Sequence, residues 1–146
     1  MKKTFADALR GILSAIKGER NMRVHITAAA YVILFGLIVK LSCTEWICAI
    51  FCIGLVIGAE MINTAVERLC DALHPEFSEK IGKVKDVAAG AVLVFAFAAA
   101  AVGCGIFFCR ESRMNMLIFA QNHIVLSILI VLSIPITFYF AQRRKK

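Results

Sequence analysis

Four long apolar stretches dominate the sequence, at residues 24–39, 46–65, 87–109 and 118–140. A helix needs about 20 apolar residues to cross the hydrocarbon core of a bilayer. Hydrophobic residues make up 60% of the 146 positions, which is more than a soluble domain of this length can bury. The sequence therefore predicts an all-α integral membrane protein in which each stretch forms a transmembrane helix.

The second stretch is unusual because it contains a carboxylate. Only 14 uncharged residues separate Glu45 from Glu60, so a helix that crosses the membrane here carries Glu60 within or at the edge of the bilayer. An ionisable group at that depth is costly and normally has a functional reason. Glu60 is therefore the first candidate for a functional site.

The basic residues predict the orientation of the chain in the membrane. Fourteen of the 17 Lys and Arg residues fall within residues 1–25, 68–85 and 143–146. Because short cytoplasmic segments retain basic residues, both termini and the connection between the second and third spans are predicted to be cytoplasmic. The net charge of +7 then reflects this topology and attraction to anionic lipid, and no nucleic-acid partner is expected.

The segment before the first span has the pattern of an amphipathic helix. Apolar side chains recur at helical spacing at Phe5, Leu9, Ile12 and Ile16, and polar residues occupy most positions between them. This pattern predicts an N-terminal interfacial helix that lies on the inner leaflet.

A polar stripe runs along the cytoplasmic half of the second span. At about 100° per residue, Glu60, Asn63, Glu67 and Asp71 fall on one face and cover about 16 Å of the helix. Three carboxylates in a row repel one another unless cations enter, so the stripe favours a divalent metal or basic partners. For Glu67 and Asp71 alone, a solvated helix end explains the pattern equally well.

Three further charged residues stand at the cytoplasmic ends of other spans. Glu19 precedes the first span, where an ordinary surface charge beside Arg20 and Arg23 is the simpler interpretation. Lys85 and Asp86 precede the third span. There, Asp86 is a suitable N-terminal helix cap and Lys85 a suitable topology marker.

Three segments, taken together, resemble a known family. They are FADALRGILSAIKGERNMRVH at residues 5–25, EMINTAVERLCD at 60–71 and PEFSEKIGKVKDVAAGAVLV at 75–94. In this order they are similar to the small bacterial membrane kinases of the diacylglycerol kinase and undecaprenol kinase family, over about residues 5–109. The resemblance implies ATP- and Mg²⁺-dependent phosphorylation of a membrane lipid alcohol. It is nearer the undecaprenol kinase branch, with diacylglycerol phosphorylation as the alternative.

The resemblance also implies roles for individual residues and an assembly. Glu60 corresponds to the catalytic base, with Asn63 beside it, and Glu19 and Glu67 correspond to the carboxylates that bind Mg²⁺ with ATP. The implied nucleotide-contacting residues are Glu19, Glu67, Glu76, Phe77, Ser78, Lys85 and Asp86. The family implies a homotrimer in the bacterial cytoplasmic (inner) membrane, with each active site shared between neighbouring subunits.

The chain departs from the family by continuing after the third span. We therefore expect a membrane lipid kinase domain at residues 1–112, and at 113–146 an additional C-terminal transmembrane helix with a basic cytoplasmic tail. A stabilising or lipid-facing helix is the simplest interpretation of the addition.

Two interpretations without catalysis remain as alternatives. In a small cation transporter, Glu60 and Asn63 would line an ion path, but the polar stripe stops at Glu60 and the outer half of that helix is apolar. An assembly subunit would have the scaffold without turnover, although the complete set of implied site residues argues against it.

Overall fold

The computed structural model describes residues 2–74, 76 and 78–143 and is built from helices. In chain order these are α1 (Lys2–Gly18), α2 (Arg20–Val39), α3 (Cys43–Leu73), α4 (Glu79–Phe107), α5 (Arg110–Asn122) and α6 (Ile124–Gln142). No strand occurs in the described ranges. Because α2, α3, α4 and α6 are each long and apolar enough to cross a membrane, the predicted all-α membrane architecture is confirmed.

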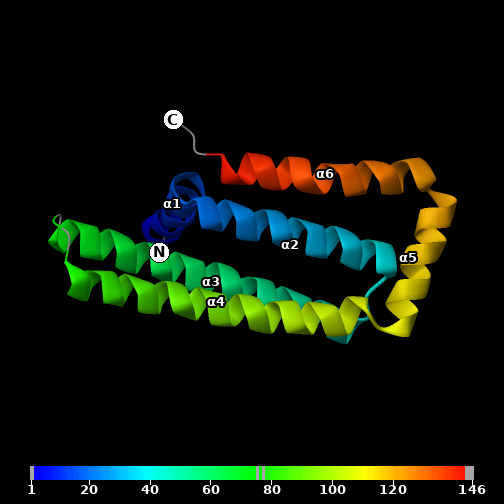
Figure 1. Ribbon diagram of the computed structural model, residues 1–146, viewed down its shortest axis with the longest axis horizontal. Helices are drawn as coiled ribbons and strands as arrows, with labels where there is room; N and C mark the ends of the chain where they lie inside the picture. Colours follow the sequence, from blue (N-terminus) through cyan, green and yellow to red (C-terminus); the bar gives the residue numbers. More distant parts are fainter. Residues whose placement is uncertain (1, 75, 77, 144–146) are drawn as a thin grey trace.

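The four long helices lie alongside one another, and α5 crosses one end of the bundle (Figure 1). The most extensive packing is between α3 and α4, and α2 packs on α3. Among the described residues, α6 contacts only α2 and α5 and touches neither α3 nor α4. The last helix therefore lies on the outside of a unit formed by the first three spans.

The ends of the helices are arranged as the distribution of basic residues predicts. The start of α2, the end of α3, the start of α4 and the end of α6 all lie at the end of the bundle opposite α5 (Figure 1). At that end α3 and α4 project beyond the other two helices. The predicted cytoplasmic segments therefore share one side of the bundle.

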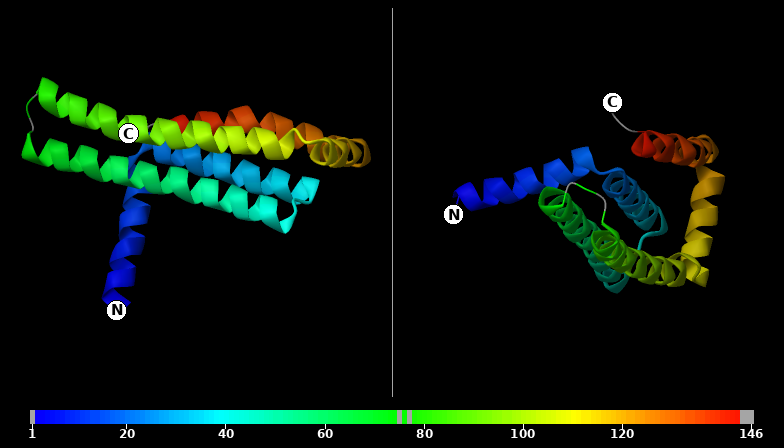
Figure 2. Two further views of the ribbon diagram at one scale, coloured as in Figure 1. Left: turned by 90° about the horizontal axis from the view of Figure 1, so that it is seen from below. Right: turned by 60° about the vertical axis from the view of Figure 1, so that its left-hand side comes forward.

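The N-terminal helix projects away from the bundle, as Figure 2 shows. Glu19 alone separates α1 from α2, and its backbone is extended. On α1, the side chains of Phe5, Leu9 and Ile12 are exposed, which suits contact with a membrane surface. The predicted helix is confirmed, and its contact with lipid stays a prediction.

A capping box begins α3, the helix that contains the whole polar stripe. The Ser42 N–H donates to Glu45 Oε2 at 2.8 Å, and the Glu45 N–H donates to Ser42 Oγ at 3.4 Å. From there α3 continues unbroken to Leu73, about two turns past the predicted span at 46–65.

The prediction of Asp86 as the cap of the third span is wrong. The helix begins at Glu79, seven residues earlier, with Ser78 at the N-cap position. The charged segment before the predicted span is therefore part of the helix. Within it, Glu79 Oε1 pairs with Lys83 Nζ at 2.7 Å, one turn away. Asp86 therefore lies inside α4.

The fourth span is shorter than predicted because the chain turns at His123. Its backbone (φ −135°, ψ 53°) separates α5 from α6, so only α6 aligns with the other spans. Gln121 and Asn122 also lie at this corner. Polar side chains are costly within hydrocarbon, which accounts for a turn at this position.

Polar contacts attach α6 to α2. The Tyr31 hydroxyl lies 2.8 Å from Ser133 Oγ and 2.9 Å from Thr137 Oγ1. Nearer the start of α2, Arg23 Nε donates to the Ala141 carbonyl at 3.1 Å. Such interhelical hydrogen bonds fix the register of membrane helices whose remaining contacts are apolar.

A close approach between α2 and the start of α3 allows a test of this packing. A Cβ added at Gly36 would lie 2.9 Å from Cη2 of Trp46 and 3.0 Å from Cδ1 of Leu41. We expect Gly36→Ala to lower the free energy of unfolding by about 1–3 kcal/mol, because the indole has to move.

The measurement is the midpoint of thermal unfolding in detergent. Gly54→Ala is the matched control, since no described atom within 4 Å would meet its Cβ. A Gly36→Ala midpoint equal to that of the control would show that the α2–α3 contact is looser than described.

Candidate active site

Three polar residues within about one turn of α3 are almost completely buried. Glu60 is 2%, Asn63 5% and Thr64 4% exposed. Each retains an atom without a hydrogen-bond partner among the described residues: Glu60 Oε2, Asn63 Oδ1 and Thr64 Oγ1. An unpaired buried polar group costs about 1–3 kcal/mol, so such groups are normally satisfied. These three residues, called here the α3 polar cluster, therefore have the character of a binding site.

A carboxylate lies beside the α3 polar cluster, on the side toward the C-terminal end of α3. Asn63 Nδ2 donates to Glu67 Oε1 at 2.9 Å, and Glu67 is half-buried. Arg68, next to Glu67 on α3, lies 3.4 Å from Glu19 at the junction of α1 and α2. The site therefore gathers three acidic side chains, an arrangement that attracts cations.

Arg68 brings Glu19 to this region from the α1–α2 junction. Its Nη2 lies 3.4 Å from Glu19 Oε1, and its Nη1 donates to Ser14 Oγ at 2.9 Å. This exposed guanidinium therefore joins α1 and the start of α2 to α3. Glu19, for which an ordinary surface charge beside Arg20 and Arg23 was the simpler interpretation, pairs with Arg68 of α3.

Glu19 and Glu67 have the donor chemistry for a magnesium ion that is bound together with phosphates. Mg²⁺ commonly takes one or two carboxylates and completes its coordination with water and substrate phosphates. Within the described residues, no group of three or more His, Cys, Asp or Glu side chains is placed to hold a metal. Two carboxylates are enough for such an ion when water and phosphates complete its coordination.

Lys85 forms an ion pair at the far end of the polar stripe. Its Nζ pairs with Asp71 Oδ1, where Lys85 is half-buried and Asp71 is exposed. This ion pair joins α4 to α3 about 16 Å along the helix from Glu60. The neighbouring Asp86 is exposed on α4.

The remaining predicted residues lie in and next to the connection between α3 and α4. Glu76 is exposed and Ser78 is half-buried, while Phe77 lies outside the described residues. Leu73, the last residue of α3, is about 20 Å from Glu60 along the helix axis. The structure thus brings Glu19, Glu60, Asn63 and Glu67 together, and it places Glu76, Ser78, Lys85 and Asp86 toward the projecting end of α3 and α4.

Sequence reasoning missed two residues of this site, Thr64 and Arg68. Both continue from Glu60 at intervals of four, so they lie on one flank of the polar stripe. The helical spacing was a usable signal for both, but neither an uncharged hydroxyl nor one more basic residue near a cytoplasmic end stands out in the sequence.

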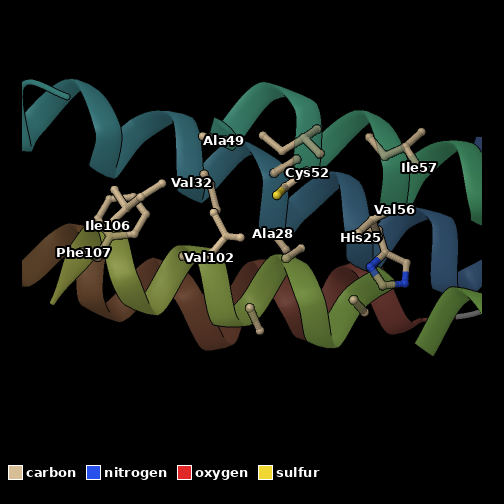
Figure 3. A pocket seen from close by; sticks show the side chains of 16 residues that line it. His25, Ala28, Val32, Ala49, Cys52, Val56, Ile57, Val102, Ile106 and Phe107 are labelled. Atoms are coloured by element: carbon tan, nitrogen blue, oxygen red, sulfur yellow. The ribbon is translucent and has the colours of Figure 1, made fainter. Parts of the chain in front are cut away.

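An apolar groove of about 280 Å³ runs between α2, α3 and α4 (Figure 3). Seven of its 16 lining residues are alanine or glycine, which keeps the space between the helices open. On α3 the lining includes Val56 and Ile57, one turn before Glu60, and His25 lies at the same end of the groove (Figure 3). The groove therefore leads along α3 toward the α3 polar cluster.

Comparisons with known proteins agree on one family. Residues 6–107 match the sequence profile of prokaryotic diacylglycerol kinase. An undecaprenol kinase from Bacillus subtilis is 38% identical over 105 residues, which cover 72% of this chain and 85% of that protein. A diacylglycerol kinase from Synechocystis sp. is 33% identical over 101 residues, or 68% of this chain and 58% of that protein. No solved structure gives a significant match.

Proposed function

The chain belongs to the prokaryotic diacylglycerol kinase family, and we propose that it transfers the γ-phosphoryl group of ATP to undecaprenol, forming undecaprenyl phosphate. Membership of a lipid kinase family sets aside the transporter alternative. The acceptor is proposed from the Bacillus subtilis relative, which matches over more of its length and at higher identity than the Synechocystis protein. Diacylglycerol, the substrate in the name of the second relative and of the family, is the alternative acceptor.

The observation that carries this proposal is the unpaired Glu60 carboxyl beside an apolar groove. A lipid alcohol would place its hydroxyl at Glu60 Oε2 and so supply the hydrogen-bond donor that the described residues do not. Its hydrocarbon chain would lie in the groove past Val56 and Ile57. A water-soluble acceptor has no hydrocarbon chain to pack in that groove.

In the proposed reaction Glu60 acts as general base. The acceptor hydroxyl gives its proton to Glu60 Oε2 while its oxygen forms a bond to the γ-phosphorus, and the bond between that phosphorus and ADP breaks. Burial of Glu60 at 2% exposure keeps its carboxyl away from water, which would otherwise compete as acceptor.

Glu19 and Glu67 are proposed to hold Mg²⁺ together with ATP. When bound, the ion supplies charge neutralisation at the triphosphate. Asn63 orients Glu67 through the 2.9 Å hydrogen bond, and Arg68 keeps Glu19 near α3. The protein thereby fixes two carboxylates from different helices at one place.

The proposed nucleotide contacts extend from this point along the projecting end of α3 and α4. They are Glu76, Phe77, Ser78, Lys85 and Asp86. The Lys85 ammonium has three donors, so its pairing with Asp71 leaves donors for a phosphate oxygen.

We also propose a setting for the enzyme. Both termini would face the cytoplasm in the bacterial inner membrane, as supported by the placement of the helix ends on one side of the bundle. Residues 1–112 would form the kinase domain and 113–146 an accessory helix, as supported by the end of the family match at residue 107. A homotrimer with shared active sites is the proposed assembly.

An acceptor assay tests the proposed function directly. Purified full-length protein is given undecaprenol and diacylglycerol together with ATP labelled at the γ-phosphate. We expect the label in undecaprenyl phosphate. Label in phosphatidic acid alone would establish the alternative acceptor, and no label in either lipid would refute the proposed kinase activity.

The role of Glu60 predicts the effect of removing its charge. We expect Glu60→Gln to lower kcat at least about 100-fold, as for loss of a general base, and to leave the Kd for the nucleotide within about twofold. Glu111→Gln is the control, because Glu111 is an exposed carboxylate on α5, outside the family match. Near-normal turnover by Glu60→Gln would remove Glu60 from the role of base.

The role of Glu67 predicts a change in the magnesium requirement. Glu67→Gln keeps an oxygen that can accept from Asn63 but removes the charge. We expect the Mg²⁺ concentration for half-maximal activity to rise about tenfold or more, as when one carboxylate ligand is lost. The measurement is a Mg²⁺ titration at fixed ATP with Glu111→Gln in parallel. Coincident titration curves would exclude Glu67 as a metal ligand.

A further inference from the structure

Thr64 differs from Thr27 and Thr137, two other threonines in the helices of this protein. Thr27 Oγ1 donates to the Arg23 carbonyl at 2.8 Å, and Thr137 Oγ1 donates to the Ser133 carbonyl at 2.9 Å. A threonine inside a helix commonly satisfies its hydroxyl in this way, on the carbonyl four residues earlier. The Thr64 hydroxyl makes no such bond and has no other partner among the described residues, although Thr64 is only 4% exposed.

The Thr64 hydroxyl is also the one donor group of the α3 polar cluster that makes no hydrogen bond among the described residues. The unpaired atoms of Glu60 and Asn63 are oxygens that accept hydrogen bonds, and the Asn63 amide nitrogen donates to Glu67. A hydroxyl can donate as well as accept. An anionic ligand that enters this cluster therefore meets an unpaired hydroxyl donor at Thr64.

The position of Thr64 along α3 indicates which part of the reaction it faces. It lies one turn, about 6 Å, from Glu60 in the direction of Asp71. The apolar groove approaches Glu60 from the opposite direction, through Val56 and Ile57. Thr64 therefore stands on the side of Glu60 from which the phosphates would arrive.

We propose that the Thr64 hydroxyl donates a hydrogen bond to an oxygen of the phosphoryl group during its transfer from ATP to the lipid, an inference that rests on the proposed function. The bond from the acceptor oxygen to phosphorus forms, the bond from phosphorus to ADP breaks, and the acceptor proton goes to Glu60. Thr64 keeps its own proton throughout. A fixed donor in a buried site stabilises the charge that the phosphoryl oxygens carry in the transition state.

The test compares Thr64→Val, which removes the hydroxyl, with Thr64→Ser, which keeps it, in the full-length protein. We expect Thr64→Val to lower kcat about 10- to 100-fold, the effect of losing a hydrogen bond to a charged group. The KM for the lipid should stay within about twofold, and Thr64→Ser should retain kcat within about threefold. Thr27→Val is the matched control, because the Thr27 hydroxyl is already bonded to its own helix.

Thermal unfolding separates a role in catalysis from a role in folding or assembly. Since the unpaired hydroxyl contributes no bond to the folded protein, Thr64→Val should unfold at or above the wild-type midpoint and keep the wild-type oligomeric size. A lowered midpoint or a changed size would show that the hydroxyl is bonded within the assembly, and would overturn the proposal. If Thr64→Val does not fold, Thr64→Ala removes the same hydroxyl, and the same kcat, KM and oligomeric size are expected of it, with a midpoint lowered by the loss of its buried methyl group.

Two further results would also overturn the inference. One is a wild-type kcat for Thr64→Val, and the other is an increase in the KM for the lipid without a change in kcat, which would place the hydroxyl on the acceptor. In both cases the wild-type protein still phosphorylates lipid, so the proposed function stands. If the wild-type protein phosphorylates neither lipid, the proposed function itself fails.

Discussion

The arrangement of this protein depends on the cost of keeping the Glu60 carboxyl inside an apolar helix bundle. A carboxyl at that depth needs a partner, and the described residues leave its Oε2 atom without one. Two features of the surroundings bear on this group. The apolar groove between α2, α3 and α4 leads toward it, and Arg68 links α3 to a second carboxylate, Glu19. The energetic cost of burying this carboxyl is thus connected with the proposed reaction, because a substrate hydroxyl can supply the hydrogen bond that Glu60 Oε2 lacks.

Much of the fold could be predicted because hydrophobicity alone identifies membrane helices. Glu60 could be predicted for the same reason, since only 14 uncharged residues precede it. The helix ends could not, because an apolar stretch marks the thickness of the bilayer and not the length of the helix. For this reason α4 extends past Asp86 to Glu79, and the predicted fourth span divides at His123.

The site was predictable to the extent that its residues share one helix. The spacing of Glu60, Asn63 and Glu67 places them together on any straight helix, and the structure agrees. The approach of Glu19 depends on the turn between α1 and α2 and on the contacts of Arg68, which helical spacing does not encode. Thr64 could be identified only from the structure, because what sets it apart is a buried hydroxyl without a hydrogen-bond partner.

The central claim is that Glu60 meets the lipid hydroxyl on one side and the triphosphate on the other. A structure of the complete assembly, with a non-hydrolysable ATP analogue and the lipid alcohol bound, measures this as the distance from the Glu60 carboxylate to the acceptor oxygen. We expect a hydrogen-bond distance of about 2.6–3.2 Å, with the terminal phosphate next to that oxygen. A Glu60 side chain that faces bulk lipid tails, or that is bonded to protein while the acceptor oxygen lies elsewhere, would contradict it.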